Sequence, residues 1–388
     1  MFGESFSLFR VLGFEVRANV SWLFLALLIT WSLAEGFFPY AYPDLAAGTY
    51  WLMGLAGMLG LFASLLLHEL SHSLVARAYG LPVGGITLFL FGGVAEMLSE
   101  PKTPGVEFRM AIAGPIASIV LGLAFSALAM LMVALGIPEH VAGVASYLGF
   151  INFLLAIFNM VPGFPLDGGR VLRAALWHRS GDIRWATRWA ARFGQGFGVL
   201  LIALGLMNLF AGNIIPGMWW ALIGMFVNGA AGLSYRQLLA RLALEGRTVR
   251  RFMTADPVTV PAATVLRDFV DDYLYHHAVD LFPVVEEGRL LGCVGLAQVK
   301  QVAREQWERM PVREICMGCG AGNTIEADSD AAAALESMQR SKTTRLMVIE
   351  DGRLVGMLVL KDLLRYLGIR EALGETPDEA QDGILGGQ

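Results

Sequence analysis

The sequence predicts a polytopic α-helical membrane protein with six transmembrane helices, a short membrane-embedded β-hairpin and a C-terminal water-soluble α+β domain. Hydrophobic residues make up 55% of the 388 residues and charged residues only 16%, whereas soluble domains have about 25% charged residues. The charges are also unevenly spread, because residues 1–247 carry 26 of them and residues 248–388 carry 37. This composition disfavours a disordered chain and a protein that binds nucleic acid directly.

The six predicted spans are apolar stretches, each close to the ~20 residues that cross a bilayer. They lie at residues 19–36, 52–76, 110–135, 142–161, 195–211 and 217–235. Residues 83–98 are also apolar, but this stretch is too short for a span, is rich in glycine and contains Glu96. We therefore expect it to form the embedded hairpin. Residues 1–19 lack the apolar core and cleavage site of a signal peptide.

The distribution of Lys and Arg predicts the orientation of the spans. The loops after the first, third and fifth spans contain neither residue, whereas every other loop and the N-terminal arm contain at least two. Positively charged loops stay in the cytoplasm, so both termini are expected on the cytoplasmic side of the cell membrane. The chain has three cysteines, all after residue 247, which is too few for a disulfide framework and suits a reducing compartment.

Residues 248–388 contain an internal repeat with a spacing of about 63 residues. Each copy has two predicted strands, at 281–292 and 345–356, joined at a Glu-Gly or Asp-Gly pair that suits a tight turn. Flanking helices are expected at 265–277, 297–305, 330–340 and 361–368. The repeat resembles a tandem pair of cystathionine-β-synthase (CBS) domains. The predicted division is a transmembrane domain at 1–247, CBS domains at 248–309 and 310–372, and a flexible tail at 373–388.

The second span contains the cluster His68-Glu69-Leu70-Ser71-His72. Histidines four residues apart share one face of a helix, so His68 and His72 can hold one metal ion, and neutral imidazoles suit Zn²⁺. Glu69 lies beside that position, where its carboxylate can take a proton from a bound water. A chance match is the alternative. A charged residue at hydrocarbon depth costs on the order of 2.5–3.5 kcal/mol, which favours a functional site.

Asp167 is the candidate for a third metal ligand. Two prolines before it break the fourth span, and the glycines Gly168 and Gly169 after it permit a sharp turn. Asp167 is thus expected on irregular backbone at membrane depth, and the alternative is a helix cap just outside the membrane. Both motif-bearing spans run towards the cytosol, so the topology predicts that the histidines and Asp167 reach a similar depth.

The paired motifs resemble the site-2 protease family of intramembrane zinc metalloproteases, in its subgroup with six spans and C-terminal CBS domains. The matching residues are His68, Glu69, His72, Asn159, Pro162, Asp167 and Gly168. The resemblance implies a zinc endopeptidase in which His68, His72 and Asp167 bind one zinc ion and Glu69 is the catalytic base and acid. It implies that Asn159 helps to hold the substrate.

The resemblance extends to two further segments. Residues 91–97 (Phe-Gly-Gly-Val-Ala-Glu-Met) match a membrane-embedded strand, which implies that Gly92, Gly93 and Val94 pair with an unwound substrate. The Ala113-Gly114-Pro115 segment matches a family feature assigned to helix packing. The implied substrate is a membrane-spanning protein, such as an anti-sigma factor or a similar tethered regulator, cut in the lipid bilayer near the cytosolic face in regulated intramembrane proteolysis.

The resemblance of the C-terminal part to CBS pairs implies an adenine nucleotide ligand, with Asp362 in the ribose-binding position. The hydroxyl residue of that motif is missing, so a module for homo-oligomerisation or substrate docking is the alternative. Cys316 and Cys319 have the CxxC spacing of a metal or redox site, but a single pair is a weak signal, so a structural or incidental role is expected. Arg170 and Arg173 are expected to be positive-inside topology residues, and contact with headgroups or with the cytosolic flank of the substrate is the alternative. The rival functions are a CBS-regulated transporter or channel and an inactive membrane scaffold.

Overall fold

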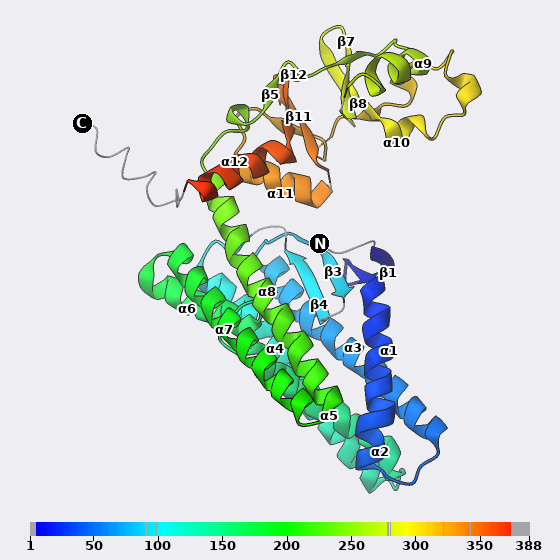
Figure 1. The fold of residues 1–388 in the computed structure, drawn as a ribbon, viewed down its shortest axis with the longest axis vertical. Coiled ribbons are helices and arrows are strands. Elements are labelled where there is room, and N and C mark those ends of the chain that lie inside the picture. The colour runs from blue at the N-terminus through cyan, green and yellow to red at the C-terminus, as the bar shows by residue number, and fades with distance from the viewer. Residues whose placement is uncertain are drawn as a thin grey trace. The chain divides into compact units, whose positions relative to one another are not determined.

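The computed structural model of the chain describes residues 5–89, 92–97, 100–277, 279, 281–320, 322–341 and 343–373. The chain divides into two compact units, Met1–Leu238 and Leu239–Gln388 (Figure 1). The first is mainly helical and the second contains two small β-sheets. Residues 374–388, which form most of the predicted tail, lie outside the described residues.

Six helices in the described part of the chain are long and apolar enough to cross a membrane, as predicted. They are Val20–Ala41, which comprises α1 (Val20–Ser32), a π-helical turn (Leu33–Phe37) and α2 (Phe38–Ala41), and then α3 (Ala47–Ala78), α4 (Pro104–Ala134), α5 (Glu139–Asn159), α7 (Ile183–Phe210) and α8 (Ile214–Leu244). Most extend beyond the predicted stretches, and in α7 and α8 the added turns contain arginines. With 32 residues, α3 is about 48 Å long.

Side-chain caps explain where two of these helices begin. The side chain of Asn19 accepts a hydrogen bond from the backbone N–H of Ser21 at the start of α1. Thr103 caps α4 in the same way, and Pro104 occupies its first position, where a missing N–H costs nothing. The short helix α6 (Asp167–Ser180), which was predicted to be part of a loop, packs against α4 and α7.

A four-stranded sheet accompanies the helices of the first unit. Its order is β1 (Ser5–Val11), β2 (Phe14–Asn19), β3 (Val83–Phe89) and β4 (Gly92–Met97). The predicted hairpin is β3–β4, and β2 pairs with β3 in parallel. The hairpin β1–β2 was not predicted, although Phe14, Val16 and Ala18 are buried and alternate with less buried residues, which is the period of a strand.

The second unit has two four-stranded sheets that exchange strands. One contains β6 (Val260–Pro261), β7 (Leu281–Glu286), β8 (Arg289–Gly295) and β9 (Met317–Gly318), and the other contains β10 (Thr324–Glu326), β11 (Arg345–Glu350), β12 (Arg353–Val359) and β5 (Thr254–Ala255). β5 belongs to the first repeat and β9 to the second. Each sheet therefore includes one strand from the other repeat.

Repeated glycines permit this exchange. A Cβ atom on Gly292 would lie 2.1 Å from the carbonyl oxygen of Met317 in β9, and a Cβ on Gly356 would lie 2.9 Å from that of Thr254 in β5. The predicted Glu-Gly and Asp-Gly turns are present, with positive φ at both residues of each pair.

The helices of this unit are α9 (Leu266–Asp268), which continues as a π-helical turn (Phe269–Leu274), α10 (Leu296–Val299), α11 (Ala331–Ser341) and α12 (Leu360–Ala372). The prediction of a helix at 297–305 was wrong. After α10, the backbone N–H groups of Gln301 and Val302 donate to carbonyls three residues earlier, as in a 3₁₀-helix. The indole N–H of Trp307 donates to the carbonyl of Val302, so the α-helix ends after one turn.

Candidate metal centre

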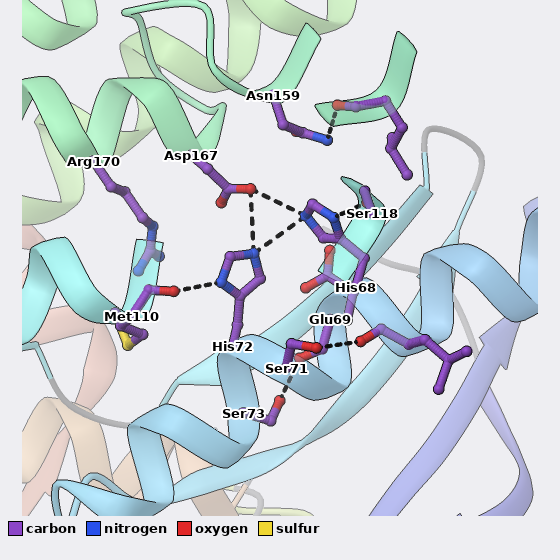
Figure 2. A network of polar contacts seen from close by, with 12 residues as sticks. His68, Glu69, Ser71, His72, Ser73, Met110, Ser118, Asn159, Asp167 and Arg170 are labelled. Carbon is purple, nitrogen blue, oxygen red and sulfur yellow. Dashed lines mark hydrogen bonds and ion pairs between the residues drawn. The ribbon is translucent and has the colours of Figure 1, made fainter. Parts of the chain in front are cut away.

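The two sequence motifs meet in space. His68 and His72 project from α3, and Asp167 is the first residue of α6. Nε2 of His68 lies 3.0 Å from Oδ2 of Asp167, Nε2 of His72 lies 3.2 Å from the same oxygen, and the two Nε2 atoms are 3.2 Å apart (Figure 2). Among the described residues, this is the only group of three His, Cys, Asp or Glu side chains arranged to hold a metal ion.

The geometry of these three atoms fits zinc. Zinc bonds of about 2.0–2.1 Å in a tetrahedral site separate neighbouring ligand atoms by about 3.3–3.4 Å, close to the observed triangle. Nδ1 of His72 lies 2.7 Å from the carbonyl oxygen of Met110, which can only accept a hydrogen bond, so Nδ1 carries the proton. In the neutral imidazole, the lone pair on Nε2 then faces a carboxylate oxygen. Such an arrangement of acceptors is stabilised by a cation.

One stripe of α4 supports the two histidines. Met110 accepts from His72, and Ser118, two turns later, lies with its Oγ 2.8 Å from Nδ1 of His68. Gly114 lies between them, and a Cβ on it would stand 2.2 Å from Nε2 of His72 and 2.5 Å from Nε2 of His68. Gly114 therefore does more than allow helix packing, because it leaves space at the ligand atoms. The contacts of Met110 and Ser118 with the histidines were not predicted from the sequence.

Close backbone packing holds the loop before Asp167. The backbone N–H of Phe164 donates to the carbonyl of Ala190 in α7, and a Cβ on Gly194 would lie 1.9 Å from the carbonyl oxygen of Phe164. A Cβ on Gly169 would lie 2.4 Å from the carbonyl carbon of Gly163. The prediction that Asp167 lies on irregular backbone was wrong. Extended backbone at Leu166 caps α6, so Asp167 begins a regular helix.

A cavity of about 170 Å³ opens beside the three candidate ligands. Its lining includes Glu69, Asn159, Gly93, Arg170 and Phe226. The amide of Asn159, the last residue of α5, donates to the carbonyl of Leu155. A larger groove of about 450 Å³ lies along α7, but its lining contains no His, Cys, Asp or Glu. Of these two cavities, only the smaller one is thus lined by side chains that can bind a metal ion or transfer a proton.

β4 forms one wall of this cavity and is one of the two edge strands of its sheet. A Cβ on Gly93 would lie 2.9 Å from Cγ of Glu69, so only glycine lets the strand approach the candidate base this closely. On the inner side, Gly92 pairs with Phe89 and Val94 pairs with Thr87. Phe91, which belongs to the matched segment, lies outside the described residues.

The two arginines of α6 differ in their surroundings. Arg170 is half-buried, lines the cavity and points an N–H at the sulfur of Met97, 3.7 Å away. Arg173 is only 4% exposed and forms ion pairs with Glu100 and Glu107. Arg173 therefore has a structural role inside the protein that positive-inside topology does not predict. A buried carboxylate on α4 draws it into the protein.

In the second unit, Asp362 lies in the first turn of α12 and is half-buried. The three cysteines are free, and residues 317–318 between Cys316 and Cys319 form an extended strand. An extended backbone separates residues three apart by about 10 Å, too far for a disulfide. Burial raises the pKa of the Cys293 thiol and keeps it protonated.

Comparisons with known proteins follow the same division of the chain. The model of peptidase family M50 matches residues 56–146 and 136–204, and the model of the CBS domain matches residues 249–304 and 323–369. The chain is similar to the "Putative zinc metalloprotease Rip3" of Mycobacterium tuberculosis, with 37% identity over 94% of this chain and 93% of that protein.

Two further proteins resemble the chain. The "Putative zinc metalloprotease sll0528" of Synechocystis sp. is 34% identical over 92% of this chain and 93% of that protein. A solved structure, the "Site-2 Protease from Methanocaldococcus jannaschii", is 27% identical, covers 60% of this chain and 95% of that chain, and has a TM-score of 0.42.

Proposed function

The chain belongs to peptidase family M50, the zinc metalloproteases of the site-2 type, and we propose that it is an intramembrane zinc endopeptidase that cleaves membrane-tethered proteins near the cytosolic face. One observation carries the proposal. Three ligand atoms of His68, His72 and Asp167 converge within 3.2 Å of one another, and Glu69 lines the cavity beside them. The proposed location is the cell membrane, with both termini in the cytoplasm.

In this proposal His68, His72 and Asp167 hold one zinc ion. A bound zinc ion supplies a Lewis acid for the scissile carbonyl and lowers the pKa of water to about 7. Glu69 accepts the proton of the attacking water and returns it to the leaving amine nitrogen. The bond from His72 to the Met110 carbonyl keeps that imidazole in the tautomer that presents Nε2 to the metal, and the contact of His68 with Ser118 orients its ring.

A peptide bond inside a helix is shielded, so the substrate has to unwind before it is cut. The edge of β4 suits an unwound segment, because an extended peptide can add to a sheet edge through main-chain hydrogen bonds. Gly92, Gly93 and Val94 are the proposed pairing residues, and Gly93 lies against Glu69. Asn159, at the end of α5, lines the same cavity and is the proposed polar contact to the substrate backbone.

We further propose that the CBS pair modulates this activity through an adenine nucleotide held in part by Asp362, or through homo-oligomerisation. Titrating ATP and AMP against the full chain and its Asp362→Ala variant distinguishes the two, because only nucleotide binding depends on that carboxylate. The rival functions of CBS-regulated transport and inactive scaffolding give Glu69 no role beside the candidate ligands.

The test of the proposed function separates metal binding from catalysis. Purified protein should contain about one zinc ion per chain, and the His68→Ala variant should lack it. The Glu69→Gln variant should retain zinc but lose cleavage of a co-expressed single-span substrate. Glu139→Gln, at the exposed start of α5, is the matched control and should cleave normally. Cleavage that survives Glu69→Gln would overturn the assigned mechanism. Mass spectrometry of membrane proteins that accumulate in cells carrying Glu69→Gln identifies substrates.

A further inference from the structure

A buried ion cluster joins α6 to α4, away from the candidate ligands. Nε of Arg173 donates to Oε1 of Glu107 over 2.6 Å, and a terminal nitrogen of Arg173 donates to Oε2 of Glu100 over 2.9 Å. The Glu107 side chain is fully buried. The guanidinium also lies over the ring of Phe164, 5.1 Å from its centroid. Burying this charge is costly unless its partners stay in place.

The cluster lies on the same stripe of α4 that supports the histidines. Glu107, Met110, Gly114 and Ser118 follow one another at intervals of three or four residues, which places them on one face of the helix. Glu107, at the N-terminal end of this stripe, binds Arg173 of α6, and the rest of the stripe contacts His68 and His72. A single rigid element therefore contacts all three candidate ligands or their supports.

Arg173 is connected to the chain on both sides of Asp167. Its own helix begins at Asp167, about 9 Å away at 1.5 Å per residue. Its ring contact is to Phe164, three residues before Asp167. Both the segment that leads into Asp167 and the helix that follows it are thus fixed to the same guanidinium.

We propose that Glu107 and Arg173 are positioning residues for the metal centre, because their ion pair sets where the Asp167 carboxylate stands relative to the two histidines. The inference rests on the proposed zinc site. An apolar contact would let α6 slide or turn on α4, whereas the fork of Arg173 holds two carboxylates in a fixed direction. Metal sites tolerate deviations in ligand distance of about 0.2 Å, so this directional restraint matters for affinity.

The test measures metal binding by the full-length protein in nanodiscs. Arg173→Met and Glu107→Gln are each expected to weaken zinc binding about 10–100-fold, the effect of removing a residue that orients a metal ligand. At saturating Co²⁺, their absorption spectra should differ from that of the wild type, because the carboxylate meets the metal differently. Arg173→Lys should recover only part of the affinity. Arg179→Met, an exposed arginine of the same helix, is the matched control and should behave as the wild type.

A variant with one unpaired buried charge can unfold, so the double variant Glu107→Gln/Arg173→Met decides between positioning and stability. Removing both charges should return the unfolding temperature of the apo protein to its wild-type value, while the zinc affinity stays at least about 10-fold weaker than that of the wild type. Wild-type affinity and a wild-type Co²⁺ spectrum in the double variant would overturn the inference. A wild-type protein that binds no zinc would instead overturn the proposed function.

Discussion

Replacing Gly114 by alanine is expected to prevent zinc binding while α4 stays intact. The new Cβ would lie 2.2 Å from Nε2 of His72 and 2.5 Å from Nε2 of His68, whereas ordinary contact begins at 3.4 Å. The His72 ring would therefore have to retreat by about 1.2 Å, several times the ~0.2 Å tolerance of a metal site. Retreat from α4 would also stretch the bonds of both histidines to Met110 and Ser118.

The expected loss of zinc affinity is at least about 100-fold, the upper end for residues that surround a metal, which corresponds to about 2.8 kcal/mol. Alanine favours a helix over glycine by about 1 kcal/mol, so the loss would not come from a weaker α4. Zinc content by mass spectrometry and affinity by chelator competition measure the effect. Gly105→Ala, where a Cβ meets nothing within 4 Å, is the control on the same helix. Stoichiometric zinc at wild-type affinity in Gly114→Ala would refute the reasoning.

Three further predictions concern other sites. Ser118→Ala removes the partner of Nδ1 of His68 and should weaken zinc binding about 10-fold, whereas Ser126→Ala, whose hydroxyl bonds within α4, should not; equal affinities would contradict this. Gly292→Ala places a methyl group against the Met317 carbonyl and should destabilise the CBS pair by about 1–3 kcal/mol. The measurement is hydrogen exchange, which should become faster in β8 and β9. In the control Gly318→Ala, the new Cβ meets no atom within 4 Å, and stability should not change. In native protein a thiol reagent should label exposed Cys319 well before Cys293, because the Cys293 side chain is buried. Equal labelling rates would contradict this prediction.

The candidate site divides into parts that sequence can and cannot predict. His68, Glu69 and His72 are close in sequence, so helical periodicity alone brings them together, and the charge of the loops predicts that Asp167 ends at their depth. Ser118 and Met110 lie 50 and 38 residues from the histidines they contact. A serine in a helix and a backbone carbonyl carry no local signal of such a partner, so only the packing of α4 on α3 reveals them.

Charge gives a second example. In sequence, Arg173 is one of six basic residues in a loop that is predicted to be cytosolic, and positive-inside topology explains all six equally well. The structure separates Arg173 from the others, because Glu107 lies at the start of α4, 66 residues earlier, and is fully buried. The hairpin β1–β2 was missed for a different reason. Alternation over so few residues is too weak to distinguish a strand from an irregular arm.

Because of the strand exchange in the second unit, its two sheets can form at different times during synthesis. β9 follows its partner β8 by about 25 residues, whereas Ala255 in β5 pairs with Gly356, 101 residues later. At the ribosome's pace of about 5–20 residues per second, β5 waits about 5–20 s for its partner while the first sheet can already close. β5, the first strand of the unit, is thus among the last to be paired. A chain whose synthesis stalls before residue 356 leaves β5 without its partner strand β12.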